Sequence, residues 1–154
     1  MNDEILHLHA QVLWNQVRVS VASVGGSGTI IYSQEAESGF HTYALTCHHV
    51  IDKAISVKEE WDSRVGREKK REYRQLVTVE FFDYSNVPHG HRPVTFSVDA
   101  DLVAYDPRHD MALLLLRTVK PAAAAAKLLA LDKIESLYIG TPVVAVGCAL
   151  LHDP

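Results

Sequence analysis

The chain has 154 residues, of which 47% are hydrophobic and 22% are charged, and its formal net charge is −4. These values are typical of one globular domain, and the negative net charge argues against a nucleic-acid partner. No window holds the roughly 18 apolar residues that a membrane-spanning helix needs, and the first residues lack the pattern of a secretory signal. We therefore expect a cytoplasmic protein without membrane contact.

The hydrophobic pattern predicts a short amphipathic helix followed by many short strands. The helix is expected over residues 3–14, and "HVIDKA" (49–54) predicts one further helical turn. The sequence "GGSG" (25–28) is expected to break the chain between two strands. The predicted strands cover residues 16–23, 29–33, 40–46, 76–84, 94–106, 111–117 and 139–150. Many short strands with little helix favour an all-β fold, either an antiparallel barrel or a sandwich.

The segment 56–75 has a different composition from the predicted strands around it. It is dense in charges of both signs, which is typical of a solvated loop or an extended hairpin arm. The alanine-rich stretch that begins at Pro121 predicts a linker or one helical turn.

Two residues at the ends of predicted elements are candidates for acid–base chemistry. His49 follows a predicted strand and opens a short helix, where a side chain is held rigidly. Asp110 directly precedes the apolar strand "MALLLL" (111–116), so we expect a buried carboxylate that needs a partner. An imidazole that activates a hydroxyl needs such a carboxylate to fix its tautomer. Each residue alone is also compatible with a structural role.

Four motifs in order resemble trypsin-like serine proteases, in particular the HtrA-like branch. They are "GSG" (26–28), "YALTCHHVID" (43–52), "DPRHDMALLLL" (106–116) and "IGTPVVAVG" (139–147). The resemblance implies that His49, rather than His48, is the general base and that Asp110 orients it. It also implies a six-stranded antiparallel β-barrel, the first of two, with a strand near 141–147 that opens the second.

On this resemblance the chain is expected to divide into four parts. These are an N-terminal helix (1–15), a first barrel (16–120) that carries the charged arm (56–75), a linker (121–138) and the opening strand of a second barrel (139–154). That last strand is apolar and uncharged, so self-association through 141–148 is also expected.

The family's nucleophilic serine lies in a Gly-x-Ser-Gly-Gly type motif that these 154 residues do not contain. Ser27 precedes His49 and falls on a first-barrel strand, and Cys148 falls on the second barrel's first strand, so neither is expected to replace it. The sequence therefore predicts the N-terminal half of a serine endopeptidase acting on peptides or proteins, inactive as this chain alone. The alternative is a non-catalytic module of protease ancestry that binds peptide or protein, with the arm as its contact surface.

The nine histidines also suggest a metal site, because several occur as pairs. A zinc site needs three or four converging ligands, and nothing in the sequence joins the pairs. The two cysteines, Cys47 and Cys148, form no metal-type or redox-type pair in sequence. We therefore expect neither metal nor cofactor. The paired histidines are His7 with His9, His48 with His49, and His89 with His91.

Overall fold

The computed structural model describes residues 11–37, 39–84, 93–134 and 138–148. Most of the helix predicted over residues 3–14 lies outside these residues, and of its described residues, 11–14, only 11 and 12 are helical. The histidine pairs His7 with His9 and His89 with His91 also lie outside them.

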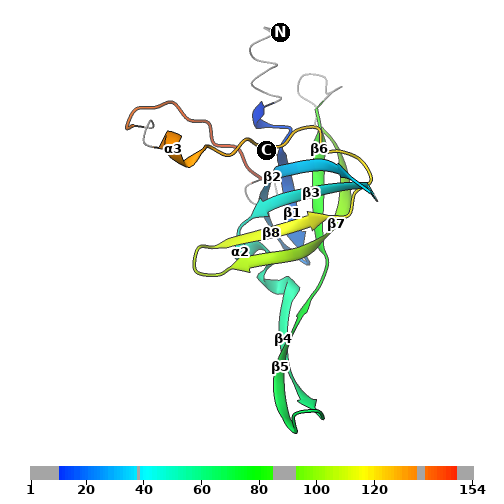
Figure 1. Cartoon of the computed structure of the whole chain (residues 1–154). Coiled ribbons are helices and arrows are strands. Elements are labelled where there is room, and N and C mark those ends of the chain that lie inside the picture. Colours follow the sequence, from blue (N-terminus) through cyan, green and yellow to red (C-terminus); the bar gives the residue numbers. More distant parts are fainter. Residues whose placement is uncertain (1–10, 38, 85–92, 135–137, 149–154) are drawn as a thin grey trace.

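Six antiparallel strands form a closed barrel, in the order β1-β2-β3-β8-β7-β6 (Figure 1). Pairing of β1 with β6 closes it, which joins strands far apart in the sequence. The predicted six-stranded barrel is thereby confirmed. The strands are β1 (Gln16–Val21), β2 (Val24–Ala36), β3 (Gly39–Thr46), β6 (Val77–Asp83), β7 (Val94–Asp106) and β8 (Met111–Leu116).

The core of the barrel follows from the alternation of apolar residues along the strands. In β1 the buried positions are Val17, Val19 and Val21, and the intervening Arg18 and Ser20 are only partly buried. Strand β8 is apolar throughout, and burial still alternates along it, with the buried positions at 112, 114 and 116. Successive side chains of a strand point to opposite faces, so one face of each strand fills the barrel.

The glycine-rich stretch does not break the chain as predicted but lies inside β2. The reason is close packing on this part of the strand. A Cβ on Gly26 would lie 2.6 Å from Cγ2 of Val50, and a Cβ on Gly28 would lie 2.7 Å from Cγ2 of Val19. The glycines therefore allow neighbouring elements to approach the strand, rather than interrupting it.

Replacing Gly26 with Ala should lower the free energy of unfolding by about 1–3 kcal/mol, because the new methyl group overlaps the stiff side chain of Val50. Without that overlap, replacing Gly with Ala in a strand would leave the free energy of unfolding unchanged or raise it. The double variant Gly26→Ala/Val50→Ala is the matched control, and urea unfolding is the measurement. If the double variant lost as much free energy of unfolding as Gly26→Ala and Val50→Ala lose together, the two side chains would not be in contact.

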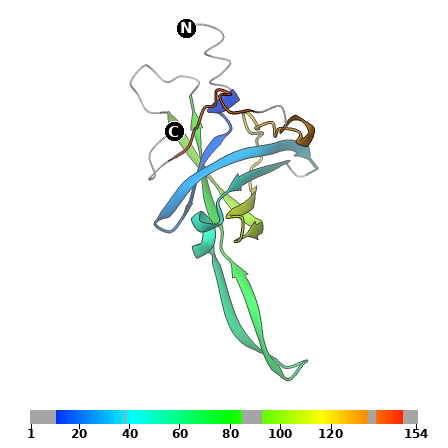
Figure 2. The same cartoon turned by 90° about the vertical axis from the view of Figure 1, so that its left-hand side faces the viewer.

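A two-stranded hairpin, β4 (Ile55–Asp62) and β5 (Arg67–Arg74), projects away from the barrel. We call it the arm; Figures 1 and 2 both show it extending from the end of the barrel where α2 lies. The hairpin is one of the two forms that the charge pattern predicted. Acidic residues of β4 face basic residues of β5, as in Asp62 with Lys69 at 3.0 Å and Glu60 with Arg71 at 3.2 Å.

Deleting residues 60–71 and closing the hairpin with a short Gly-rich turn should leave the melting temperature unchanged within about 2 °C. The arm buries almost nothing, with Trp61 67% exposed, and exposed ion pairs contribute little. The deletion keeps Arg74, which donates to the carbonyl oxygens of Leu102 and Val103 and joins the base of the arm to β7. A large drop in melting temperature would mean that the arm supports the barrel.

The strand predicted over residues 139–150 is not formed in its described part, 139–148. Residues 141–148 belong to no strand, and Val143 and Val144 are 87% and 66% exposed. The reason is that every barrel strand already has two neighbours, so the closed barrel offers this segment no free edge. Self-association through the segment stays a prediction.

The chain after β8 is held to β2 by single hydrogen bonds. The N–H groups of Ala122 and Ala126 donate to Ser33 Oγ and to the Ile30 carbonyl, at 3.0 and 2.7 Å. A short helix that the sequence did not predict, α3 (Leu131–Ile134), lies on a loop beside the barrel (Figure 1). In the described part of the chain, no helix has the length and apolar character needed to span a bilayer.

Candidate active site

His49 is carried by a short helix that two buried side chains fix against the barrel. Strand β3 ends at Thr46, Cys47 is extended, and α2 (His48–Ile51) follows, continued by the 3₁₀ turn Asp52–Ala54. Val50 and Ile51 are buried in the core. This anchoring holds the backbone of His49 in place and leaves its side chain outside.

The preceding residue, His48, contributes to packing at the same end of the barrel. Its ring stacks on Tyr105 of β7, with the ring centroids 5.3 Å apart. This agrees with the choice of His49, not His48, as the candidate base.

Asp110 is presented by the turn between β7 and β8. Asp106 shapes this turn by accepting hydrogen bonds from the N–H groups of Arg108 and His109. Asp110 itself has a φ of 52°, which is uncommon for a residue with a side chain, although Asp tolerates it better than most. Such conformations often occur at functional sites, where the surrounding structure holds them.

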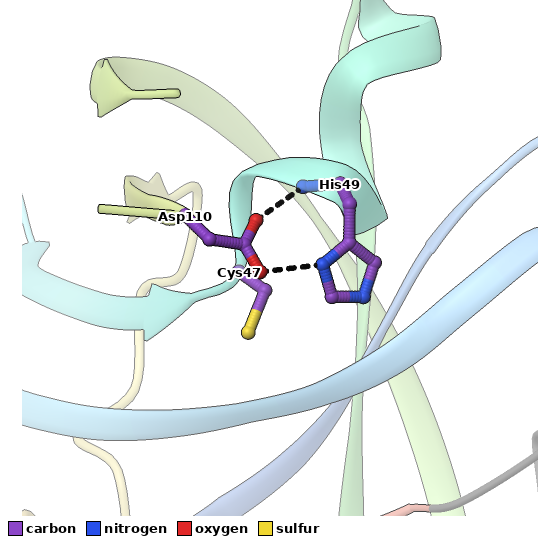
Figure 3. Close-up of side chains that lie close together, drawn as sticks. All are labelled: Cys47, His49 and Asp110. Atoms are coloured by element: carbon purple, nitrogen blue, oxygen red, sulfur yellow. Dashed lines mark hydrogen bonds and ion pairs between the residues drawn. The ribbon is translucent and has the colours of Figure 1, made fainter. Parts of the chain in front are cut away.

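His49 and Asp110 are joined by a pair of hydrogen bonds, shown in Figure 3. The backbone N–H of His49 donates to Asp110 Oδ1 at 2.9 Å, and His49 Nδ1 lies 2.7 Å from Asp110 Oδ2. The carboxylate is thus fixed by the backbone of the same residue whose ring it contacts. Since an ionised carboxylate can only accept, Nδ1 carries the proton in this arrangement and Nε2 of the neutral ring has a free lone pair.

The hydrogen bonds from His49, first the backbone N–H and then the ring, lower the pKa of Asp110 below its ordinary value. The carboxylate is therefore ionised at neutral pH. The expected burial of Asp110 is not observed: its side chain is 47% exposed and that of His49 is 69% exposed. Pairing, rather than burial, satisfies the carboxylate, because the turn that carries it lies at the end of the barrel.

The two residues weighed as substitute nucleophiles have other contacts. Ser27 Oγ accepts a hydrogen bond from the N–H of Cys148 at 2.6 Å, and the Ser27 carbonyl accepts one from Thr46 at 2.8 Å. Cys148 is buried, with its thiol toward the carbonyl of Val17. Across the described ranges, Asp110 is the one hydrogen-bond partner of the His49 side chain.

Cys47 is a site residue that the sequence analysis missed. Ligand atoms of Cys47, His49 and Asp110 all lie within 4.8 Å of one another. Partial burial raises the pKa of the Cys47 thiol, and the negative charge of Asp110 raises it further. The available signal was the position of Cys47 two residues before His49, but its proximity to Asp110 depends on how α2 begins.

Of the three histidine pairs, only His48 and His49 lie among the described residues. His7, His9, His89 and His91 lie outside the described residues. Of the adjacent pair, only His49 belongs to the group of potential ligands.

A family model of the trypsin-like peptidase domain matches residues 26–153, a range that includes both His49 and Asp110. The chain belongs to this family. Its protease ancestry agrees with the closed barrel and with the place of both residues at one end of it. Comparison with curated proteins gives no match.

Among solved structures, this trypsin-like domain is similar to one described as the crystal structure of Deg5. The TM-score is 0.46 at 19% sequence identity, and the match covers 77% of this chain. It spans 45% of the Deg5 chain.

Proposed function

We propose that this chain supplies the general base and the orienting carboxylate of a serine endopeptidase. His49 would take the proton from a serine hydroxyl through Nε2 and later return it to the leaving amine. Asp110 would hold the ring in the tautomer with the proton on Nδ1 and stabilise the imidazolium that forms. The substrate class is peptide or protein, and the reaction is hydrolysis through an acyl-enzyme.

The observation that carries this proposal is the 2.7 Å contact between His49 Nδ1 and Asp110 Oδ2. It supports the role because a base acting through Nε2 needs its other nitrogen occupied by an acceptor. The nucleophile would come from residues outside these 154, together with the backbone donors that stabilise the oxyanion.

A serine-directed fluorophosphonate probe tests the proposal. The 154-residue chain should not be labelled, whereas the polypeptide that the whole reading frame encodes should be labelled on one serine, and His49→Ala should slow that labelling strongly. Labelling of the longer polypeptide that is unaffected by His49→Ala would contradict the role of His49. Stoichiometric labelling of the 154-residue chain would contradict the assignment of the nucleophile to residues outside it.

The second candidate is a non-catalytic module that binds peptide or protein. It is favoured by the arm, since β4 and β5 form a sheet of two strands and each pairs only with the other among the described residues. An exposed strand edge can accept an added peptide strand. Absence of any labelled serine in the longer polypeptide, with peptide binding that is lost when the arm is removed, would favour this candidate.

A further inference from the structure

We propose that Cys47, His49 and Asp110 form a binding site for Zn²⁺ at the candidate active site. The three residues offer one sulfur, one nitrogen and one oxygen ligand, and these atoms lie within 4.8 Å of one another (Figure 3). Of the histidine pairs that the sequence suggested, the site uses only His49, and it does not depend on a serine nucleophile.

The types of ligand select the metal. A thiolate and an imidazole suit Zn²⁺, whereas Mg²⁺ and Ca²⁺ prefer sets made entirely of oxygen ligands. With Cys47 as thiolate and Asp110 ionised, the two negative charges balance the charge of the ion. Three protein ligands and one solvent molecule would complete a tetrahedral site.

The distances require only a small rearrangement. In a tetrahedral zinc site, nitrogen and oxygen ligands lie about 3.3 Å apart, and sulfur lies about 3.6 Å from either. His49 Nδ1 and Asp110 Oδ2 would separate from 2.7 Å to that distance, and rotation of the Cys47 side chain would bring the sulfur in. Asp110 Oδ1 would keep its hydrogen bond from the His49 backbone N–H, which orients the carboxylate as outer contacts do in metal sites.

Metal binding and the His49–Asp110 hydrogen bond exclude one another. Zn²⁺ takes the Nδ1 lone pair, so the ring proton must move through solvent to Nε2, and the thiol proton of Cys47 leaves to solvent. A ring protonated on Nε2 cannot accept a proton there. If His49 is the base of the proposed peptidase, occupancy by Zn²⁺ would therefore inhibit it; the binding itself does not rest on that function.

Titration of the 154-residue chain with Co²⁺ as a spectroscopic substitute for Zn²⁺ tests the site. We expect a cobalt–thiolate charge-transfer band that Zn²⁺ abolishes and that Mg²⁺ and Ca²⁺ leave unchanged. The band should be lost in Cys47→Ser and retained in the matched variant Cys148→Ala. In His49→Ala and in Asp110→Asn, the affinity for Zn²⁺ should fall by about tenfold or more.

Absence of the band from the wild-type chain would overturn the proposal, and so would a band that persists in Cys47→Ser. Full affinity in both His49→Ala and Asp110→Asn would also overturn it, because the thiol would then bind without the other two ligands. All of these readouts are independent of catalysis. Failure of the metal site therefore leaves the proposed peptidase role standing, and failure of that role leaves the metal site standing.

Discussion

Replacing Asp110 with Asn is expected to lower kcat for peptide hydrolysis about ten-thousandfold in the polypeptide that the whole reading frame encodes. The amide of Asn would donate to His49 Nδ1 and place the ring proton on Nε2. His49 would then be unable to take a proton from the serine. The measurement is hydrolysis of a peptide substrate at saturation, at a pH where the imidazole of the wild-type protein is neutral.

The same loop offers a matched control. Asp106 also contacts a histidine, with its Oδ2 2.6 Å from His109 Nδ1, but it lies at the other end of the turn. Asp106→Asn keeps an oxygen that accepts from the N–H groups of Arg108 and His109, so kcat should stay within a few-fold of wild type. Equal losses in the two variants would mean that Asp110 supports the turn rather than the chemistry.

Replacing Leu114 with Ala is expected to lower the free energy of unfolding by about 2–5 kcal/mol. Leu114 lies in the middle of β8, is fully buried, and pairs across the sheet with Ala44 on one side and Leu102 on the other. Because the barrel is closed, its strands cannot collapse easily into the space that the missing atoms leave. Chemical denaturation followed by circular dichroism measures the loss.

Met111, at the start of the same strand, is the control, since it is 45% exposed. Met111→Ala should change the free energy of unfolding by about 0.5 kcal/mol or less. A loss below about 1 kcal/mol for Leu114→Ala would show that the interior of the barrel is not packed as described.

Strands bounded by polar residues were predicted well from the sequence. The predicted strand 94–106 coincides with β7, and the predicted strand 111–117 extends one residue beyond β8. The local sequence was enough to locate these two strands, because polar residues mark where each one begins and ends. It could not reveal the closure of the barrel by β1 and β6, or the irregular pairing between Leu102 and Ala104, since both depend on contacts between distant segments.

Two differences between the predicted and the observed strands have physical causes of the same kind. Residues 25–28 have the composition of a turn, yet they form part of β2 because α2 and β1 pack where side chains would otherwise stand. Residues 141–148 have the composition of a strand, yet a closed barrel gives them no partner. In both places the tertiary context overrides local propensity.

The candidate site was predictable in part. His49 and Asp110 were found from their positions at the ends of elements and from the resemblance to a family. The exposure of their side chains was not predicted, because burial depends on which segments cover the end of the barrel. Cys47 was missed because its relation to Asp110, 63 positions later in the printed sequence, exists only once α2 and the β7–β8 turn meet.

The state of the His49 ring is the most direct test of the account, and it can be measured on the 154-residue chain. Nitrogen-15 NMR of the neutral ring should show the proton on Nδ1, with a low-field hydrogen-bonded signal that disappears in Asp110→Asn and persists in Asp106→Asn. A ring protonated on Nε2 in the wild-type chain, or spectra that are the same in wild type and Asp110→Asn, would contradict the proposal that Asp110 orients His49 as a base.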